Sequence, residues 1–193
     1  MNISNSRGPY EPVGFVREPF VRVADLGTSF VATLDTGGGW YEKGSMAFTA
    51  IETIERPRGE VWAAATDWER VPQWMMGIDA FEPLSQGTDG VGTRLRFRAR
   101  GDAHHSQIVA WEPGERLVLR SRQRGMTADY VYTFRDCPEG TEVTLAAGCR
   151  GETTVWRMLA PIVGFMMKRV DGGQISALKK MIESEPFNRS LAA

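Results

Sequence analysis

The sequence is poor in cysteine and histidine, and its charges nearly cancel. Twenty-three basic side chains against twenty-four acidic ones leave a formal net charge of -1, so no overall field attracts nucleic acid or anionic lipid. The two histidines, His104 and His105, are adjacent. Adjacent residues of a strand point to opposite faces, so this pair does not hold a metal in the usual way. We therefore expect no nucleic-acid partner and no metal site.

The signatures of several enzyme classes are also missing. No Gly-x-Ser-x-Gly, His-Glu-x-x-His, Cys-x-x-Cys or Walker motif occurs, which sets aside the standard hydrolase and nucleotide-binding functions, and no cofactor is expected. Residues 1–9 lack the basic stretch, apolar run and cleavage site of a secretory signal. We therefore expect a cytoplasmic protein.

Long apolar runs are absent. The most apolar stretch, residues 155–170, includes Arg157, Pro161, Lys168 and Arg169, and it falls short of the ~20 apolar residues that a membrane-spanning helix needs. We expect a core helix here and no stable membrane insertion.

The two cysteines, Cys137 and Cys149, are not expected to form a disulfide. A tight turn at Glu139 and Gly140 would leave Cys149 about eight residues along the partner strand, roughly 26 Å from Cys137 at ~3.3 Å per residue. A disulfide needs Cα atoms within about 7 Å of each other. Two free thiols agree with a reducing compartment.

The hydrophobic pattern predicts an α+β domain that begins near residue 46. Residues 46–54 alternate as a half-buried strand does. Residues 58–66 and 68–74 predict two short helices, and Asp67 is placed to cap the second. Six further strands with short, antiparallel connections are predicted at residues 81–84, 92–100, 106–112, 116–122, 127–135 and 141–149.

The last regular element predicted is a long amphipathic helix over residues 153–183, bent at Pro161 and at Gly172-Gly173. Before the domain, the chain is rich in glycine and turn formers, with strand-like runs at residues 20–23 and 29–34. The predicted organisation is an N-terminal extension (1–45), one domain (46–184) and a C-terminal tail (185–193).

Three segments resemble the SRPBCC superfamily, which includes START-type lipid-binding domains, pollen-allergen-type proteins and polyketide cyclases. They are residues 54–74 (IERPRGEVWAAATDWERVPQW), 111–117 (WEPGERL) and 140–144 (GTEVT). The resemblance covers roughly residues 46–184. It implies a helix-grip fold, in which a curved antiparallel sheet wraps around a long C-terminal helix and encloses a cavity for a small hydrophobic molecule. Because members range from carriers to cyclases, the fold does not settle the function.

Alternation along the strands predicts which side chains line that cavity. Arg94, Arg96, Arg98 and Arg100 occupy one face of a strand, and burying four such charges without paired carboxylates is prohibitive, so this row is expected to face water. The opposite faces of the strands and the apolar side of the helix supply the predicted ligand-contacting residues. These are Leu95, Phe97, Trp111, Leu119, Tyr130, Tyr132, Phe134, Trp156, Leu159, Val163 and Met166. Plain core packing is the leading alternative explanation for any single one of them.

Three functions remain open at this stage. The first is a carrier or binding protein for a lipid-like or polycyclic, polyketide-like molecule. The second, implied by the resemblance, is a polyketide cyclase/dehydrase-like enzyme for aldol closure or dehydration, with Tyr130, Tyr132 and His105 as candidate proton-transfer groups that lack a visible activating partner. The third is an interaction module whose N-terminal extension docks on a protein partner, which the sequence does not identify.

Overall fold

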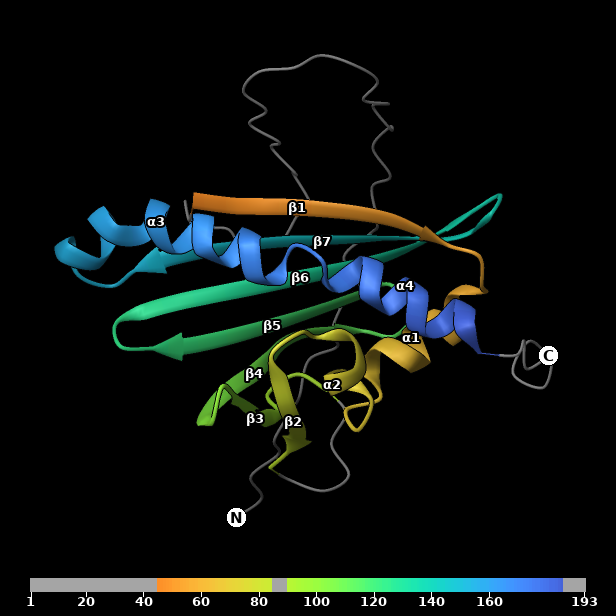
Figure 1. The fold of residues 1–193 in the computed structure, drawn as a ribbon, viewed down its shortest axis with the longest axis horizontal. Helices are drawn as coiled ribbons and strands as arrows, with labels where there is room; N and C mark the ends of the chain where they lie inside the picture. The colour runs from red at the N-terminus through yellow and green to blue at the C-terminus, as the bar shows by residue number, and fades with distance from the viewer. Residues whose placement is uncertain (1–44, 85–89, 186–193) are drawn as a thin grey trace, which may run out of the picture. The chain divides into compact units, whose positions relative to one another are not determined.

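The computed structural model describes residues 45–84 and 90–185. The predicted extension and tail therefore lie outside the described residues, apart from Ser45 and Glu185. The described part contains a seven-stranded sheet and four helices (Figure 1). Their bounds are β1 (Ser45–Ile54), α1 (Arg58–Thr66), α2 (Val71–Trp74), β2 (Ile78–Pro83), β3 (Arg94–Ala99), β4 (Asp102–Glu112), β5 (Arg116–Gln123), β6 (Met126–Cys137), β7 (Gly140–Gly151), α3 (Thr154–Asp171) and α4 (Gln174–Ser184).

The sheet is an antiparallel meander with the order β1-β7-β6-β5-β4-β3-β2. Each strand from β2 to β7 lies beside the next, as the sequence predicts, and β1 pairs with β7. Short turns join the consecutive strands from β3 to β7. Two of the turns, Arg100-Gly101 and Arg124-Gly125, have positive φ at both residues, which suits a two-residue hairpin connection. Cys137 and Cys149 are free thiols, as predicted.

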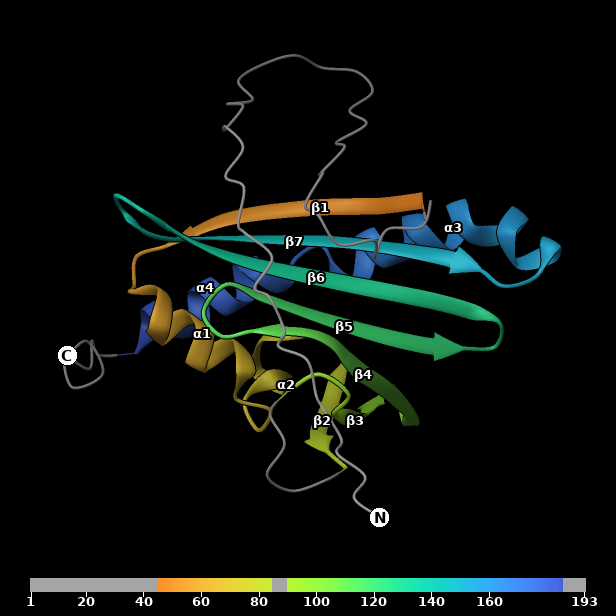
Figure 2. The same cartoon turned by 180° about the vertical axis from the view of Figure 1, so that it is seen from behind.

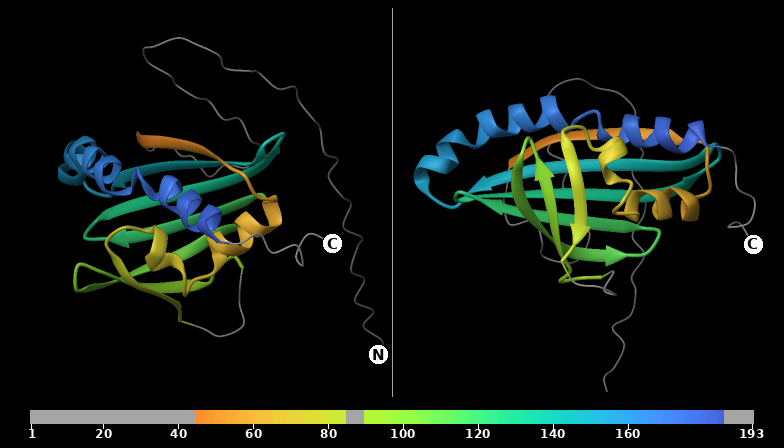
Figure 3. Two further views of the ribbon diagram at one scale, coloured as in Figure 1. Left: turned by 45° about the vertical axis from the view of Figure 1, so that its right-hand side comes forward. Right: turned by 60° about the horizontal axis from the view of Figure 1, so that its bottom comes forward.

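All four helices lie on one face of the sheet. Figure 2 shows the opposite face, where the strands stand in front of the helices. Both views of Figure 3 show α3 and α4 following one another along the sheet. No helix in residues 45–84 and 90–185 is long and apolar enough to cross a membrane.

The C-terminal helix differs from the prediction, because it is two helices rather than one. The break falls at Gly172-Gly173, where the N–H of Gly172 bonds to the carbonyl of Lys168 at 3.0 Å. Two consecutive glycines have low helix propensity, which explains the break. Pro161 lies inside α3 without ending it.

The second short helix is also shorter than predicted. It spans only Val71–Trp74, and Trp68 to Arg70 form a turn before it. Asp67 is not the N-cap of the second helix, where that position is taken by Arg70; its Oδ1 accepts from the N–H of Glu69 at 3.2 Å, within that turn. A side chain that caps a helix also stabilises a turn of this kind, so the sequence does not distinguish them.

One part of the core lies beneath α4 and α1. Ile175 and Leu178 of α4 are fully buried, and Trp62 of α1 packs edge-on against Trp111 and Phe134, with ring centroids 5.0 and 5.3 Å away. The α3 half of the concave face is less filled. There the residues buried on α3 are Ala160, Gly164 and Met167, which pack toward β1 and β7.

Candidate functional site

A cavity of 490 Å³ lies between α3 and the strands β2 to β6. It exists because α3 packs on β1 and β7, whereas the sheet continues through β6, β5 and β4 beyond the helix. At Gly164 the helix comes so close to β1 that an added Cβ would lie 3.1 Å from the Cβ of Ala47. The volume falls in the range of about 300–1,000 Å³ that is usual for small-molecule sites.

The cavity has a buried apolar floor and an exposed rim. Phe81, Leu119 and Met75 line the floor and are buried. Met76 and Met166 line the rim and are exposed. A ligand can therefore place an apolar body inside while the cavity stays open to the outside, and the flexible methionines can adapt to its shape.

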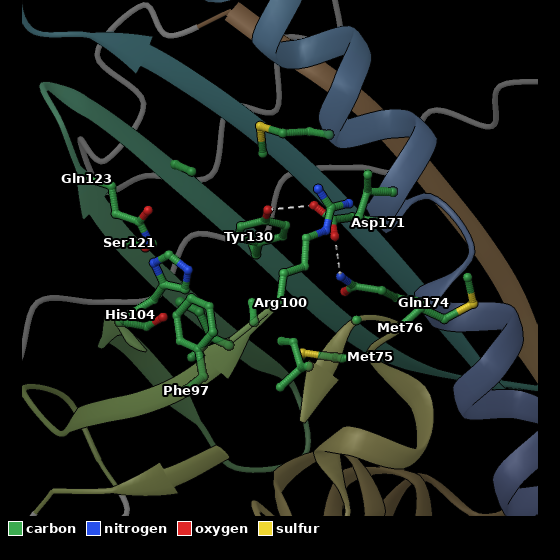
Figure 4. Close-up of a pocket in the computed structure, with 18 of the residues that line it drawn as sticks. Met75, Met76, Phe97, Arg100, His104, Ser121, Gln123, Tyr130, Asp171 and Gln174 are labelled. Carbon is green, nitrogen blue, oxygen red and sulfur yellow. Dashed lines mark hydrogen bonds between the residues drawn. The ribbon is translucent and has the colours of Figure 1, made fainter. Parts of the chain in front are cut away.

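A continuous chain of hydrogen bonds crosses the cavity wall, and Figure 4 shows the part of it that joins Tyr130, Asp171 and Gln174. The hydroxyl of Tyr130 donates to Oδ2 of Asp171 at 2.7 Å. The amide of Gln174 donates to Oδ1 of Asp171 at 3.1 Å, and its Oε1 accepts from the hydroxyl of Tyr132 at 2.8 Å. The polar groups of the site thus converge where α3 ends and α4 begins.

Burial controls the ionisation of this chain. Burial raises the pKa of Asp171, and the hydrogen bonds from Tyr130 and Gln174, together with the charge of Arg100, oppose that rise. Burial, the nearby charge of Asp171 and the hydrogen bond to it raise the pKa of Tyr130 well above its usual range. The pKa of Tyr132 is raised by burial and by Asp171. Both phenols therefore keep their protons at neutral pH, while the carboxyl group is the one that titrates.

Arg100 differs from the sequence-based expectation. Alternation placed it in an outward row with Arg94, Arg96 and Arg98, and all four are exposed. However, Arg100 also lines the cavity, and Figure 4 shows its side chain extending toward Asp171. The reason is that β3 ends at Ala99, so Arg100 belongs to the hairpin turn, where its φ of 52° takes it out of the strand alternation.

The two histidines lie on different sides of the sheet. His104 lines the cavity, and its ring lies 5.2 Å from that of Phe97. His105 is exposed on the outer face, and its carbonyl accepts from the hydroxyl of Ser121. The side chain of His105, the histidine suggested from the sequence, is thus directed away from the cavity, because it alternates along β4 with His104 and Ser106, which line the cavity.

The predicted ligand-contacting residues fall into two groups. The structure brings the first group together around the cavity: Phe97, Leu119, Tyr130, Tyr132, Val163 and Met166. The second group lies elsewhere. Leu95 is fully buried in the core, and Trp111 and Phe134 pack against Trp62. Trp156 packs on Gly125 of the β5–β6 turn, and Leu159 lies on the exposed side of α3.

Sequence reasoning missed the carboxyl group at the centre of the site. A signal was present, because Val163, Met167 and Asp171 recur every four residues and therefore share one face of α3. Gln174 continues that face beyond the two glycines. A polar pair at the end of an inward-facing apolar stripe predicts a buried polar site. Among the described residues, no cluster of three or more His, Cys, Asp or Glu is arranged to hold a metal.

Comparison with known proteins assigns the chain to a family. Residues 45–183 match the family model described as polyketide cyclase/dehydrase and lipid transport. Among curated proteins, no sequence matches the chain.

Solved structures with the same arrangement include Ara h 8.0201 (17% identity, TM-score 0.58) and TTHA0849 from Thermus thermophilus (19% identity, TM-score 0.56). The first likeness covers 72% of this chain and 97% of the other; the second covers 70% and 96%. A third, DynU16, a putative protein in the dynemicin biosynthetic locus, is 22% identical with a TM-score of 0.52, and the match covers 70% of this chain and 46% of that one. These likenesses confirm the predicted helix-grip fold.

Proposed function

Since the chain belongs to the polyketide cyclase/dehydrase and lipid transport family of the SRPBCC superfamily, we propose that it binds a small hydrophobic molecule with one polar end in the cavity between α3 and the sheet. The observation that carries this proposal is the 490 Å³ cavity itself, which combines an apolar wall with polar groups gathered at one place. Sites of this composition use the apolar wall for affinity and the few polar groups for orientation.

The hydrogen-bonding groups that Asp171 and Arg100 offer to a ligand indicate the chemistry of the ligand's polar end. Each carboxylate oxygen of Asp171 accepts one hydrogen bond from the protein and has capacity for another, so it suits a ligand hydroxyl. Arg100 carries only donors and suits a ligand carbonyl or phenolate oxygen. A polycyclic or polyketide-like molecule with neighbouring hydroxyl and carbonyl groups meets both requirements.

The experiment that tests binding is native mass spectrometry of the freshly purified full chain, followed by organic extraction. Addition of 1-naphthol, of larger hydroxylated polycyclic ketones and of fatty acids extends the test. We expect a bound mass or a saturable uptake, with hydroxylated polycyclic ketones binding more tightly than hydrocarbons of the same size. A protein that stays empty with every compound would contradict the proposal.

A second candidate function is acid–base catalysis on such a ligand, and one observation favours it. Asp171 is a partly buried carboxyl group with a raised pKa inside the cavity, which is how a general base is tuned toward neutral pH. Its carboxylate would remove a proton from the carbon beside a ligand carbonyl, and the electron pair would move to the carbonyl oxygen, stabilised by Arg100. The resulting enolate carbon would then attack a second carbonyl of the same molecule, whose oxygen recovers the proton.

One pair of variants distinguishes a binding function from a catalytic one. If the site is catalytic, Asp171→Asn abolishes turnover of a poly-β-keto substrate but leaves affinity for the cyclised product nearly unchanged. Tyr132→Phe serves as the control, because its hydroxyl reaches Gln174 rather than the carboxylate. Equal losses of turnover in both variants would count against a role of Asp171 as the base.

A further inference from the structure

The outward side of α3 exposes an unusual amount of apolar surface. Val155, Met158, Ile162, Phe165 and Met166 follow one another at helical spacing, and we call them the α3 apolar face. Their exposed fractions include 77% for Met158, 62% for Ile162 and 66% for Phe165. Residues three and four positions apart form one stripe on a helix, so these side chains make a continuous surface. Contiguous exposed apolar surface of this kind marks a site of interaction.

Packing against the sheet does not explain why the α3 apolar face is apolar. The side of α3 that meets the sheet is formed by Ala160, Gly164 and Met167, and Gly164 fits against Ala47 of β1. The α3 apolar face lies outside that contact, on a helix that Figure 1 shows at the end of the sheet away from α1. The helix is thus apolar on both sides but is covered by protein on one side within the described residues.

The charges around the α3 apolar face are mostly basic. Arg157, Lys168 and Arg169 are all exposed, and the acidic residue of the helix, Asp171, is held by Tyr130 in the cavity. At the start of α3, Glu152 accepts a hydrogen bond from Thr127.

The neighbouring hairpin turn adds to this positive charge. Gly125 packs directly on Trp156, which brings the exposed Arg122 and Arg124 close to the beginning of α3. These exposed Arg and Lys side chains make this end of the molecule locally positive, although the chain as a whole is nearly neutral.

We propose that α3 lies on an anionic lipid surface, with the α3 apolar face in the boundary between headgroups and acyl chains and the basic side chains against lipid phosphates. A helix that combines an apolar face with flanking Lys and Arg binds membranes in this orientation without spanning them. Met166 belongs both to this face and to the cavity rim. The cavity therefore opens beside the lipid, where hydrophobic molecules are dissolved.

A second copy of the chain and the segment 1–44 are two other candidates for covering the α3 apolar face, and their charges argue against both. A symmetric contact with a second copy would bring Arg157, Lys168 and Arg169 of both copies together, since a twofold interface uses the same patch twice. The segment 1–44 contains five acidic and four basic residues, so it offers little complementary charge. An anionic lipid surface complements both the apolar and the basic parts.

Vesicle co-sedimentation of the full chain tests the proposal. The vesicles are phosphatidylcholine with and without phosphatidylglycerol. We expect binding to the anionic vesicles that weakens as salt rises. Ile162→Glu should reduce binding at least about tenfold, because it places a charge in the apolar boundary. The matched control is Ile51→Glu, which alters an equally exposed isoleucine (60%) on β1, outside the α3 apolar face, and should bind within about twofold of the wild type.

The basic residues have their own test. Arg157→Gln combined with Lys168→Gln should weaken binding about 25-fold, because each Lys or Arg near an anionic surface corresponds to about a fivefold change. Arg94→Gln with Arg98→Gln removes two exposed charges from β3 and serves as the control. Circular dichroism and native mass spectrometry of ligand uptake should be unchanged in Ile162→Glu, which separates loss of docking from loss of the cavity.

Three results would overturn the proposal. Equal vesicle binding by Ile162→Glu and Ile51→Glu would show that the α3 apolar face is not the contact. A dimer in sedimentation velocity that Ile162→Glu dissociates, without vesicle binding, would assign the face to a second copy. Vesicle binding that appears only after deletion of residues 1–44 would show that the extension covers the face in the full chain.

Discussion

The hydroxyl of Tyr130 lies 2.7 Å from Oδ2 of Asp171, although the two residues are 41 positions apart and belong to β6 and α3. This bond links the middle of the sheet to the last residue of α3 and sets the polar end of the cavity. Its continuation through Gln174 to Tyr132 spans the break between α3 and α4. The ionisation of one carboxyl group is therefore coupled to the position of the helix that covers the cavity.

Removal of the Tyr130 hydroxyl should raise the pKa of Asp171. The hydrogen bond from Tyr130 stabilises the carboxylate and lowers its pKa, so Tyr130→Phe removes that stabilisation while burial still favours the neutral acid. Carboxyl-carbon NMR across a pH titration measures the shift directly. Tyr132→Phe is the control and should move the pKa of Asp171 much less, since its hydroxyl bonds to Gln174. An unchanged pKa in Tyr130→Phe would contradict the geometry of this pair.

Stability should depend on pH through Asp171. Its pKa in the folded protein is raised, so the folded state binds more protons than the unfolded state between the unfolded pKa of about 3.9 and the folded pKa. The contribution of Asp171 to the free energy of unfolding is therefore fully present below about pH 4 and is lost as pH rises through the folded pKa. Urea unfolding at a series of pH values should show this decline in the wild type and a smaller one in Asp171→Asn. If the free energy of unfolding fell equally with pH in the wild type and in Asp171→Asn, Asp171 would not be the group responsible.

Filling the cavity should block ligand uptake without unfolding the domain. Ala128 of β6 lines the cavity and is partly buried, so Ala128→Phe directs a ring into the space. We expect uptake to fall at least about tenfold and the free energy of unfolding to change by no more than about 1–3 kcal/mol, the usual effect of overpacking. Ala63→Phe, at an exposed position of α1, should leave uptake unchanged. Titration followed by native mass spectrometry measures uptake, urea unfolding measures stability, and undiminished uptake in Ala128→Phe would place the ligand elsewhere.

A glycine pair tests the contact between α3 and β1. Replacing a helical glycine with alanine usually stabilises by about 1 kcal/mol, and Gly59 of α1 has no atom within 4 Å of an added Cβ, so Gly59→Ala should show this gain. Gly164→Ala should show none, because its Cβ would lie 3.1 Å from that of Ala47. Gly164→Leu should destabilise by about 2–3 kcal/mol. Chemical denaturation compares the three, and a gain in Gly164→Ala would show that α3 stands farther from β1.

The strand pattern predicted the sheet well because an uninterrupted strand alternates with a period of two. Tyr130 and Tyr132 on β6 and Leu119 on β5 were assigned correctly to the inner face for this reason. The alternation failed where the backbone leaves the extended region. Arg100 sits in a turn with positive φ, and its side chain reaches the cavity instead of remaining in the outward row.

The polar centre of the site was not predicted because it depends on distant pairings. Asp171 meets Tyr130 only when α3 is laid against β1 and β7, and the sequence does not state where along the sheet the helix rests. Gln174 joins them only because the helix restarts after two glycines. The exposed apolar face of α3 escaped prediction for a related reason: its spacing fits a core helix equally well, since nothing in it shows how much of the helix the sheet covers.

The two glycines at 172 and 173 also separate two structural roles of the C-terminal segment. Ile175, Leu178 and Ile182 of α4 carry the buried contacts, whereas Val163, Met166 and Val170 of α3 line the cavity. Substitutions at these three α3 positions therefore reshape the cavity wall without touching the buried residues of α4, whereas Gly164 of α3 has to stay small because it packs against Ala47 of β1. We expect variants at Val163, Met166 and Val170 to change the size of ligand that the domain accepts with little loss of thermal stability, which makes these the positions to randomise when a new binding specificity is sought.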